Sequence, residues 1–229
     1  MRKSLFSSLI LYALSVSGLA AAQETPPPPA AASGLYFSGE LALGGAPGTA
    51  APGIYEASID YTTGLSGGIG YRMGPVRLEG QLRYDHFDVS SMNPVAGSPM
   101  GSPETGVNFD GWGLMGNVFF DIGSVGKIRP YLGAGIGFVD MSAQEEDFKF
   151  CFILCLERSP VVTGSDTVTA WQAMAGLAIP ASWTGGEWQA GYRYYRTGDM
   201  EFELEGYGPI HQDGLESHSV TFGIRQFLF

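Results

Sequence analysis

The sequence is poor in basic residues and in long apolar runs, and each shortage excludes a class of protein. Its 229 residues include 12 Lys and Arg against 23 Asp and Glu, a formal net charge of −11. Nucleic-acid binding needs a basic surface, so this balance argues against nucleic acid as a partner. Beyond the N-terminus no run reaches the roughly 18 apolar residues of a transmembrane helix. Helical periodicity is also absent there, and the 34 glycines disfavour helices.

The N-terminus has the composition of an export signal. Arg2 and Lys3 precede an apolar run over 5–19, and small residues follow up to Ala22. Residues 1–22 are therefore predicted to be a signal peptide cleaved after Ala22, with an uncleaved membrane anchor as the alternative. Residues 23–33 contain four consecutive prolines and several alanines, and predict a stiff, extended spacer. One β domain is expected over 34–229.

Only two cysteines are present, Cys151 and Cys155, in the segment FKFCFILCLE. Export favours a disulfide between them, with free or intermolecular thiols as the alternative. A zinc site would need about two further ligands, and this segment contains no His, so no metal is predicted. No other cofactor is predicted either.

Alternation of apolar and polar residues is the strongest structural signal. In the segment 76–85, VRLEGQLRYD, the residues Val76, Leu78, Leu82 and Tyr84 share one parity, and charged or polar residues occupy the other. Successive side chains of a strand point to opposite faces, so this segment predicts a two-faced strand. Similar alternation recurs in seven further segments. They are 35–43, 61–72, 109–121, 129–141, 168–179, 187–196 and 217–229.

The connections between these segments alternate in length. Those over 73–75, 122–128 and 180–186 are short, whereas those over 44–59, 89–108, 142–167 and 197–216 are long. An up-and-down arrangement places all short turns at one end, as in outer-membrane barrels. A soluble lipocalin-type barrel, the alternative, needs no such rule. The predicted fold is all-β, an eight-stranded antiparallel up-and-down transmembrane β-barrel with its apolar face toward lipid.

The opposite face is predicted to form a polar network in the lumen. Arg77, Glu79, Arg83, Gln172 and Arg193 are its expected members, because such side chains are costly against hydrocarbon and can pair in the interior. Eight strands enclose a lumen just wide enough for side chains to fill, so these residues should plug it. A weak or gated channel is the alternative. Aromatics near strand ends, including Phe109 and Tyr131, are expected to form girdles at the membrane surfaces.

Two segments resemble the small eight-stranded outer-membrane β-barrels of Gram-negative bacteria, the OmpA-like and opacity-type surface proteins of the porin-like superfamily. RPYLGAGIG, over 129–137, is similar to the family's "PYLGAGxG" strand, and HSVTFGIR, over 218–225, to its closing strand. The resemblance implies residence among outer-membrane lipid and lipopolysaccharide and assembly by the barrel-assembly machinery. It also implies that Phe227 and Phe229 form the C-terminal assembly signal.

The last residues depart from the usual closing strand. Phe227 and Phe229 lie on the opposite parity from Val220, Phe222 and Ile224. Either a bulge near residues 225–226 shifts the phase, or the last side chains project differently.

The predicted function is non-enzymatic: an envelope-structural or adhesive surface protein whose long loops contact host, phage or neighbouring lipopolysaccharide. A hydrolase acting on lipid A would need a nucleophile, a base and an acid in mutual reach. His218 and Ser219 are strand neighbours, so their side chains should point to opposite faces. The acidic clusters near 145–147 and 199–205 lack the spacing of a calcium-binding loop and are expected to be solvated charge.

Overall fold

A computed structural model describes residues 33–47, 49–95, 107–145, 162–183, 185–204 and 208–228. All regular structure in these ranges is β-strand, and none of it is a helix long and apolar enough to cross a membrane. The strands are β1 (Gly34–Gly45), β2 (Thr49–Ala51), β3 (Tyr55–Met73), β4 (Val76–Pro94), β5 (Val107–Asp121), β6 (Arg129–Glu145), β7 (Val162–Pro180), β8 (Gly186–Thr197), β9 (Met200–Leu204), β10 (Gly208–Gln212) and β11 (Glu216–Phe227).

Several predictions concern residues outside these ranges. The signal peptide over 1–22, nearly all of the spacer, the Cys151–Cys155 pair and Phe229 all lie outside the described residues, and what was expected of them stays a prediction.

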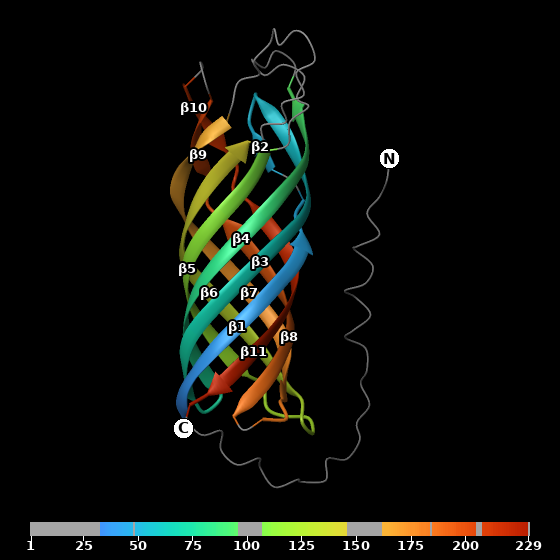
Figure 1. Cartoon of the computed structure of the whole chain (residues 1–229), viewed down its shortest axis with the longest axis vertical. Coiled ribbons are helices and arrows are strands. Elements are labelled where there is room, and N and C mark those ends of the chain that lie inside the picture. The colour runs from blue at the N-terminus through green and yellow to red at the C-terminus, as the bar shows by residue number, and fades with distance from the viewer. Residues whose placement is uncertain are drawn as a thin grey trace.

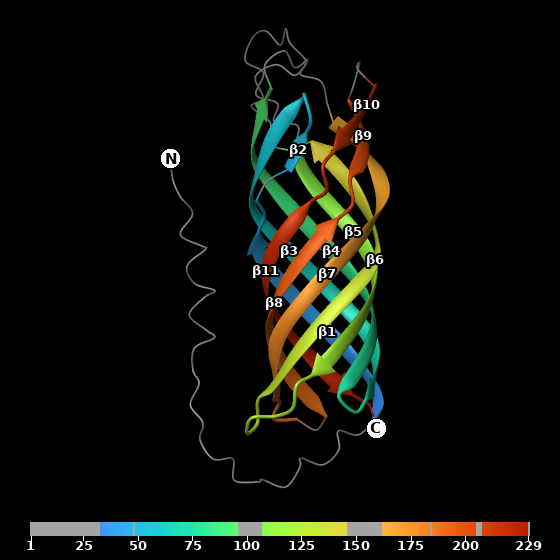
Figure 2. The same ribbon diagram turned by 180° about the vertical axis from the view of Figure 1, so that it is seen from behind.

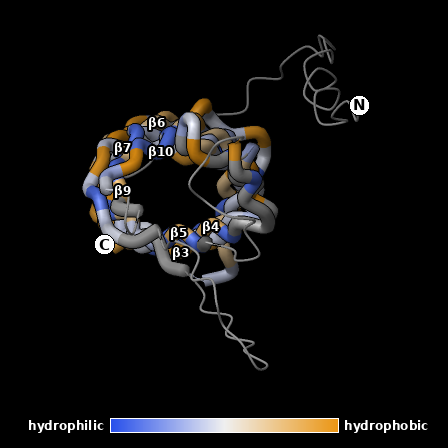
Figure 3. The backbone as a smooth tube through the Cα atoms, turned by 90° about the horizontal axis from the view of Figure 1, so that it is seen from above, coloured by the Kyte–Doolittle hydropathy of each residue, from blue (hydrophilic) through white to orange (hydrophobic). Residues whose placement is uncertain are grey.

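Eight strands close into one antiparallel ring, in the order β1, β3, β4, β5, β6, β7, β8, β11 (Figures 1 and 2). Each pairs with the next along the chain, and β11 pairs with β1 over ten residue pairs, from Tyr36 opposite Phe227 to Gly45 opposite His218. Viewed along its axis the ring is closed (Figure 3). The prediction of an eight-stranded up-and-down β-barrel is confirmed.

The short connections lie together at one end of the barrel, at the bottom of Figure 1. The tightest is the two-residue turn Gly74-Pro75 between β3 and β4. Gly74 has a φ of 60°, and proline fixes the next φ near −65°. A positive φ followed by a negative one is the combination of a type II′ hairpin turn, whose twist matches that of the flanking strands. The geometry explains why glycine precedes proline here.

Within the membrane zone the barrel has an apolar exterior and a polar interior. On β4, Leu78 and Leu82 are about half exposed on the outside, while Arg77, Glu79 and Arg83 are buried inside. The other seven strands also turn apolar side chains outward; their inner faces combine polar groups and glycines with one small buried apolar cluster of Phe119, Tyr131, Met174 and Ala178. Tilted strands of 9–11 residues span a bilayer, and the apolar outer face of β4 extends over nine residues, from Val76 to Tyr84.

Above this zone the polarity of both faces is inverted. On β4 the outer face changes from Leu82 and Tyr84 to His86 and Asp88, and the inner face from Asp85 to Phe87. The neighbouring strand β5 switches beside it, because Asp110 pairs with His86. We call the part of the barrel beyond the switch, with β2, β9 and β10, the extension. Its buried core comprises Ile59, Phe87, Phe109, Val139, Met141, Ala170, Met200, Phe202, Ile210 and Leu215.

Two expectations from the sequence are wrong. Long parts of the predicted loops are strand: β4 continues to Pro94 and β7 begins at Val162. Phe109 and Tyr131 are 0% and 3% exposed, so they point inward and belong to no girdle. Above β8, Met200–Leu204 forms β9, which continues along β7 after Gly198 and Asp199 and also pairs with β10.

Aromatic pairs mark both borders of the membrane zone on the outer face. At the switch, Tyr84 lies against Trp112 with ring centroids 5.1 Å apart, and Trp171 lies 5.0 Å from Tyr194. At the short-turn end, Trp183 and Trp188 are 5.2 Å apart. Rings of this kind are placed at the two interfaces of outer-membrane barrels.

These borders predict position-dependent costs for added charge. Leu82→Arg should lower the free energy of unfolding by about 2–4 kcal/mol, because it puts a charge against hydrocarbon. His86→Arg, on the same face of β4 but beyond the switch, should cost about 0–1 kcal/mol. Urea titration in lipid vesicles, followed by tryptophan fluorescence, measures both. Equal costs at the two positions would contradict the assigned border.

Candidate functional site: the barrel lumen

The middle of the lumen is filled by a hydrogen-bonded polar network. The guanidinium of Arg83 donates to Asp85 twice at 2.6 Å and to Oε1 of Gln172 at 2.7 Å. Nε2 of Gln172 lies 2.7 Å from Oδ1 of Asn117 and 3.1 Å from Oε1 of Gln81. The network therefore joins strands from opposite sides of the ring. Because its charges and amides are paired, it fills the interior without leaving bare charge.

Glycines on β6 make room for this filling. A Cβ at Gly135 would collide with the side chain of Asn117, and one at Gly133 with the ring of Phe119. The glycine alternation of β6 is thus explained by large side chains from β5 that lie across its inner face.

The five residues of the predicted lumen network are all buried on the inner face, but they form several groups. Arg83 is bonded to Gln172, Arg193 is paired with Glu40, and Glu79 accepts a hydrogen bond from Ser38 at 3.0 Å. Arg77 belongs instead to a cluster at the short-turn end. The parity of the sequence identifies the inward face, whereas the stagger of the strands decides which inward residues meet.

This cluster, the arginine cluster, consists of Arg72, Arg77, Arg129 and Arg225 around Asp121 and Glu187. Asp121 accepts from Arg72 at 2.7 Å and from Arg77 at 2.9 Å. Glu187 lies 2.6 Å from Arg129 and 2.9 Å from Arg225. The two carboxylates were missed as site residues, although each shares the inward parity of its strand. Both lie at strand ends, where the alternation signal is short.

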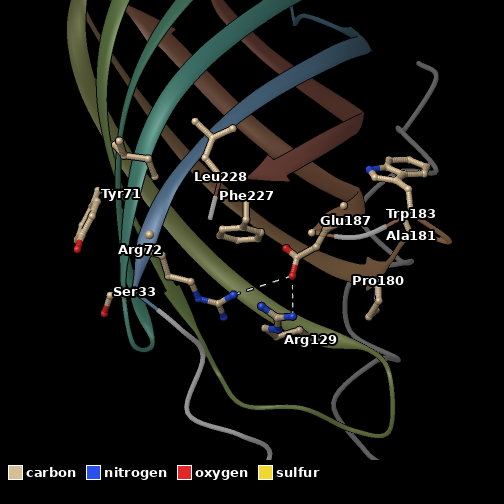
Figure 4. Close-up of a pocket in the computed structure, with 14 residues that line it drawn as sticks. Ser33, Tyr71, Arg72, Arg129, Pro180, Ala181, Trp183, Glu187, Phe227 and Leu228 are labelled. Carbon is tan, nitrogen blue, oxygen red and sulfur yellow. Dashed lines mark ion pairs between the residues drawn. The ribbon is translucent and has the colours of Figure 1, made fainter.

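The arginine cluster borders a cavity of about 660 Å³ at the short-turn end. Figure 4 shows Arg72, Arg129 and Glu187 together, with the ring of Phe227 beside them; Trp183 and Tyr71 lie at opposite edges of the cavity, and the Tyr71 side chain points away from the charged group. The indole Nε1 of Trp183 donates to Oε1 of Gln226 at 2.7 Å.

The opposite end of the lumen is closed by the apolar core of the extension. Phe202 of β9 lies against Phe109 of β5 with ring centroids 5.8 Å apart, and Met200, Ile210 and Leu215 are also buried. A backbone hydrogen bond of 2.8 Å from the nitrogen of Asp213 to the oxygen of Ala50 ties the end of the β9–β10 hairpin to β2. The hairpin therefore continues the wall of the extension from β7 toward β2, and its inward side chains Phe202 and Ile210 belong to the apolar core.

Phe227 projects into the lumen. The pairing of β1 with β11 runs without a register shift through residues 225–227, so there is no bulge at this place. The Phe227 ring lies 5.5 Å from that of Tyr36, and the guanidinium of Arg72 stands 5.4 Å from its centroid. Phe227 thus follows the second expected alternative, in which the side chain projects differently from the usual closing strand. A role of Phe227 in assembly stays a prediction.

The residues considered for catalysis are dispersed. Ser217 and Ser219 are buried in the lumen, whereas His218 lies on the outside, with Nδ1 2.5 Å from the Tyr192 hydroxyl. His86 is also outside, 2.8 Å from Asp110. Within the described ranges no three His, Cys, Asp or Glu side chains gather as a metal site would require.

A closed ring with an apolar outer band, aromatic borders and a charged, filled lumen defines a transmembrane β-barrel of the outer-membrane type. The sequence matches the family model described as outer membrane protein beta-barrel domain over residues 8–225, and the chain belongs to that family. The expected resemblance to small outer-membrane barrels of Gram-negative bacteria is confirmed. It follows that the short-turn end is periplasmic and the extension extracellular.

Solved structures of similar proteins share this fold at low sequence identity. Neisserial surface protein A is 16% identical with a TM-score of 0.54, over 86% of this chain and 99% of the other. OprG from Pseudomonas aeruginosa is 12% identical with a TM-score of 0.49, over 84% and 95%. The protease OmpT from Escherichia coli is 7% identical with a TM-score of 0.44, over 86% and 96%. No curated protein matches significantly. These likenesses show the fold alone.

Proposed function

We propose that this protein is a non-enzymatic, non-conducting surface protein that makes contacts outside the cell through its extension. The observation that carries the proposal is the inversion of polarity above the membrane. An apolar core with a polar exterior is the pattern of a water-soluble domain, so the extension is a folded platform held above the lipid. Because the lumen is filled, the extension is the part of the protein that is suited to making contacts.

The exterior of the extension is acidic. Asp88, Asp140 and Glu201 face outward, and among the described residues of this surface Arg196 is the only arginine or lysine. An acidic surface repels the phosphates of neighbouring lipopolysaccharide and attracts cationic groups. We therefore propose a partner with a basic surface, which fits a contact outside the cell better than direct binding to lipopolysaccharide.

The proposal is tested with the purified barrel in nanodiscs of neutral lipid and immobilised polylysine as the probe. The wild-type protein should bind in a salt-dependent manner. The variant Asp88→Asn/Asp140→Asn/Glu201→Gln should bind at least tenfold more weakly, because three attractive charges are removed. Neutralising Asp199, at the β8–β9 connection, serves as a single-charge control. Equal binding by the triple variant would contradict the proposed contact surface, and altered lipid A masses in cells that make the protein would contradict the non-enzymatic role.

A further inference from the structure

The arginine cluster has more positive charge than its own carboxylates neutralise. Four guanidinium groups share Asp121 and Glu187, and each carboxylate is contacted by three of the four arginines within 4.0 Å. Glu79, the next acid along β4, accepts from Ser38 and also lies within electrostatic reach of Arg77 and Arg225, so four guanidinium groups face three carboxylates. Among the described residues, Nη1 of Arg129, which lines the cavity, has no hydrogen-bond acceptor; the unpaired atoms of Arg77 and Arg225 belong to guanidinium groups that stand over the rings of Phe119 and Tyr36, away from the cavity wall. Buried donors of charged groups are costly to leave unpaired, so this end of the lumen lacks an acceptor.

The adjoining cavity has the size and lining of a small-molecule site. Its volume of about 660 Å³ falls within the usual range for ligand pockets. Arg72 and Arg129 supply charge at its wall, and the Arg129 side chain remains 18% exposed. The ring of Phe227 supplies aromatic surface beside them, whereas Tyr71 and Trp183 border the cavity from the outer face of the barrel (Figure 4). Planar guanidinium groups bind carboxylate and phosphate oxygens in pairs, and the aromatic lining suits an attached ring or aliphatic group.

We propose that this periplasmic cavity binds a small oxyanion, a carboxylate or phosphate group attached to an apolar or aromatic moiety. The oxyanion would accept from Arg72 and Arg129, the two arginines of the cluster that line the cavity, and the apolar part would lie against the ring of Phe227. The site lies at the opposite end of the barrel from the proposed contact surface and is independent of it.

The test uses the refolded barrel in detergent micelles and saturation-transfer NMR on the ring protons of three probes. Phenyl phosphate and benzoate should both bind saturably, and phenol, which has the ring without the charge, should not. Binding of only one of the two anions identifies which oxyanion the cluster accepts and supports the site. Saturable binding of phenol with the same affinity as the anions would overturn it, and so would the absence of binding by both anions.

Matched variants separate the site from general charge effects. Arg129→Gln should weaken binding of the anions at least tenfold, because it removes a charged donor. Lys127→Gln removes the same charge at the exposed turn nearby and should change the affinity less than twofold. Equal losses in the two variants would overturn the proposal.

A second pair keeps the test decisive if Arg129→Gln does not fold. Ala181 lines the cavity and makes no charged contact. Ala181→Glu places a tethered carboxylate there and should abolish binding of the free anions by competition, whereas Ala181→Gln should retain it. Heat-modifiable mobility on gels confirms that each variant is a folded barrel. Undiminished binding by Ala181→Glu would show that the anions bind elsewhere.

Discussion

Replacing Asp121 with asparagine is expected to lower the free energy of unfolding by about 3–5 kcal/mol, the cost of removing one partner of a buried ion pair. The carboxylate is only 5% exposed, accepts from Arg72 and Arg77 at 2.7 and 2.9 Å, and lies 3.8 Å from Arg129. Its loss leaves Glu187 as the one carboxylate in direct contact with the arginine cluster. Urea titration of the barrel in lipid vesicles measures the change.

Asp140→Asn is the matched control for this substitution. Asp140 lies on the exposed outer face of β6 in the extension, where its carboxylate is 3.4 Å from the Thr167 hydroxyl. Surface substitutions of this kind usually change stability by less than about 0.5 kcal/mol. If Asp121→Asn also stayed within that range, water entering from the periplasmic cavity would have to screen the arginine cluster, and the cluster would contribute little to stability.

The wild-type barrel is expected to pass no ions across a planar bilayer, because two obstructions lie in series along the lumen. The first is the network of Arg83, Gln172, Asn117 and Gln81, and the second is the apolar core of the extension, to which the β9–β10 hairpin contributes Phe202 and Ile210. Ions avoid an apolar constriction even where a gap exists, since they lose their hydration there. Discrete conductance steps from the wild type would contradict this and support the channel alternative.

Variants that remove one obstruction at a time show how much each contributes to blocking ion flow. Gln81→Ala/Gln172→Ala removes two uncharged members of the network and leaves no new charge unpaired. Replacing residues 201–211 with a short Gly/Ser linker removes the β9–β10 hairpin together with the side chains of Phe202 and Ile210 that it adds to the core. Either change alone should stay silent, whereas their combination should produce steps. Conduction by the hairpin deletion alone would show that the polar network does not seal the membrane zone.

Much of the membrane zone follows from the sequence. Alternation in VRLEGQLRYD identifies both the strand and its inward residues, because a period of two leaves no other face for the charges. The partners of those residues do not follow from it. Arg83 meets Gln172, 89 positions away, because the closure and stagger of the ring bring β4 and β7 to the same height. A single strand has no information about that stagger.

The extension could not be predicted from the same pattern, for a physical reason. At 85–87 the inward parity of β4 continues without interruption, but its chemistry changes from Asp85 to Phe87. A strand is recognised in the sequence by apolar residues that keep the same parity, and because they change parity here, the following residues are predicted to be a loop. The backbone continues as a strand because the surroundings have changed from lipid to water, and in water the apolar side chains belong inside. The sequence does contain a signal for the extension: the parity of the apolar residues changes on more than one segment, for example at Phe109–Asp110 on β5.

The inversion also fixes how deeply the protein sits in its membrane. Raising the barrel would expose Leu82 and Trp112 to water, and lowering it would drag His86 and Asp110 into hydrocarbon. Because β4 and β5 change polarity side by side, a vertical displacement is penalised on both strands rather than at one residue. The insertion depth of the barrel is therefore fixed, and so is the distance of the extension from the lipid. A thicker or thinner bilayer would have to adapt to the barrel.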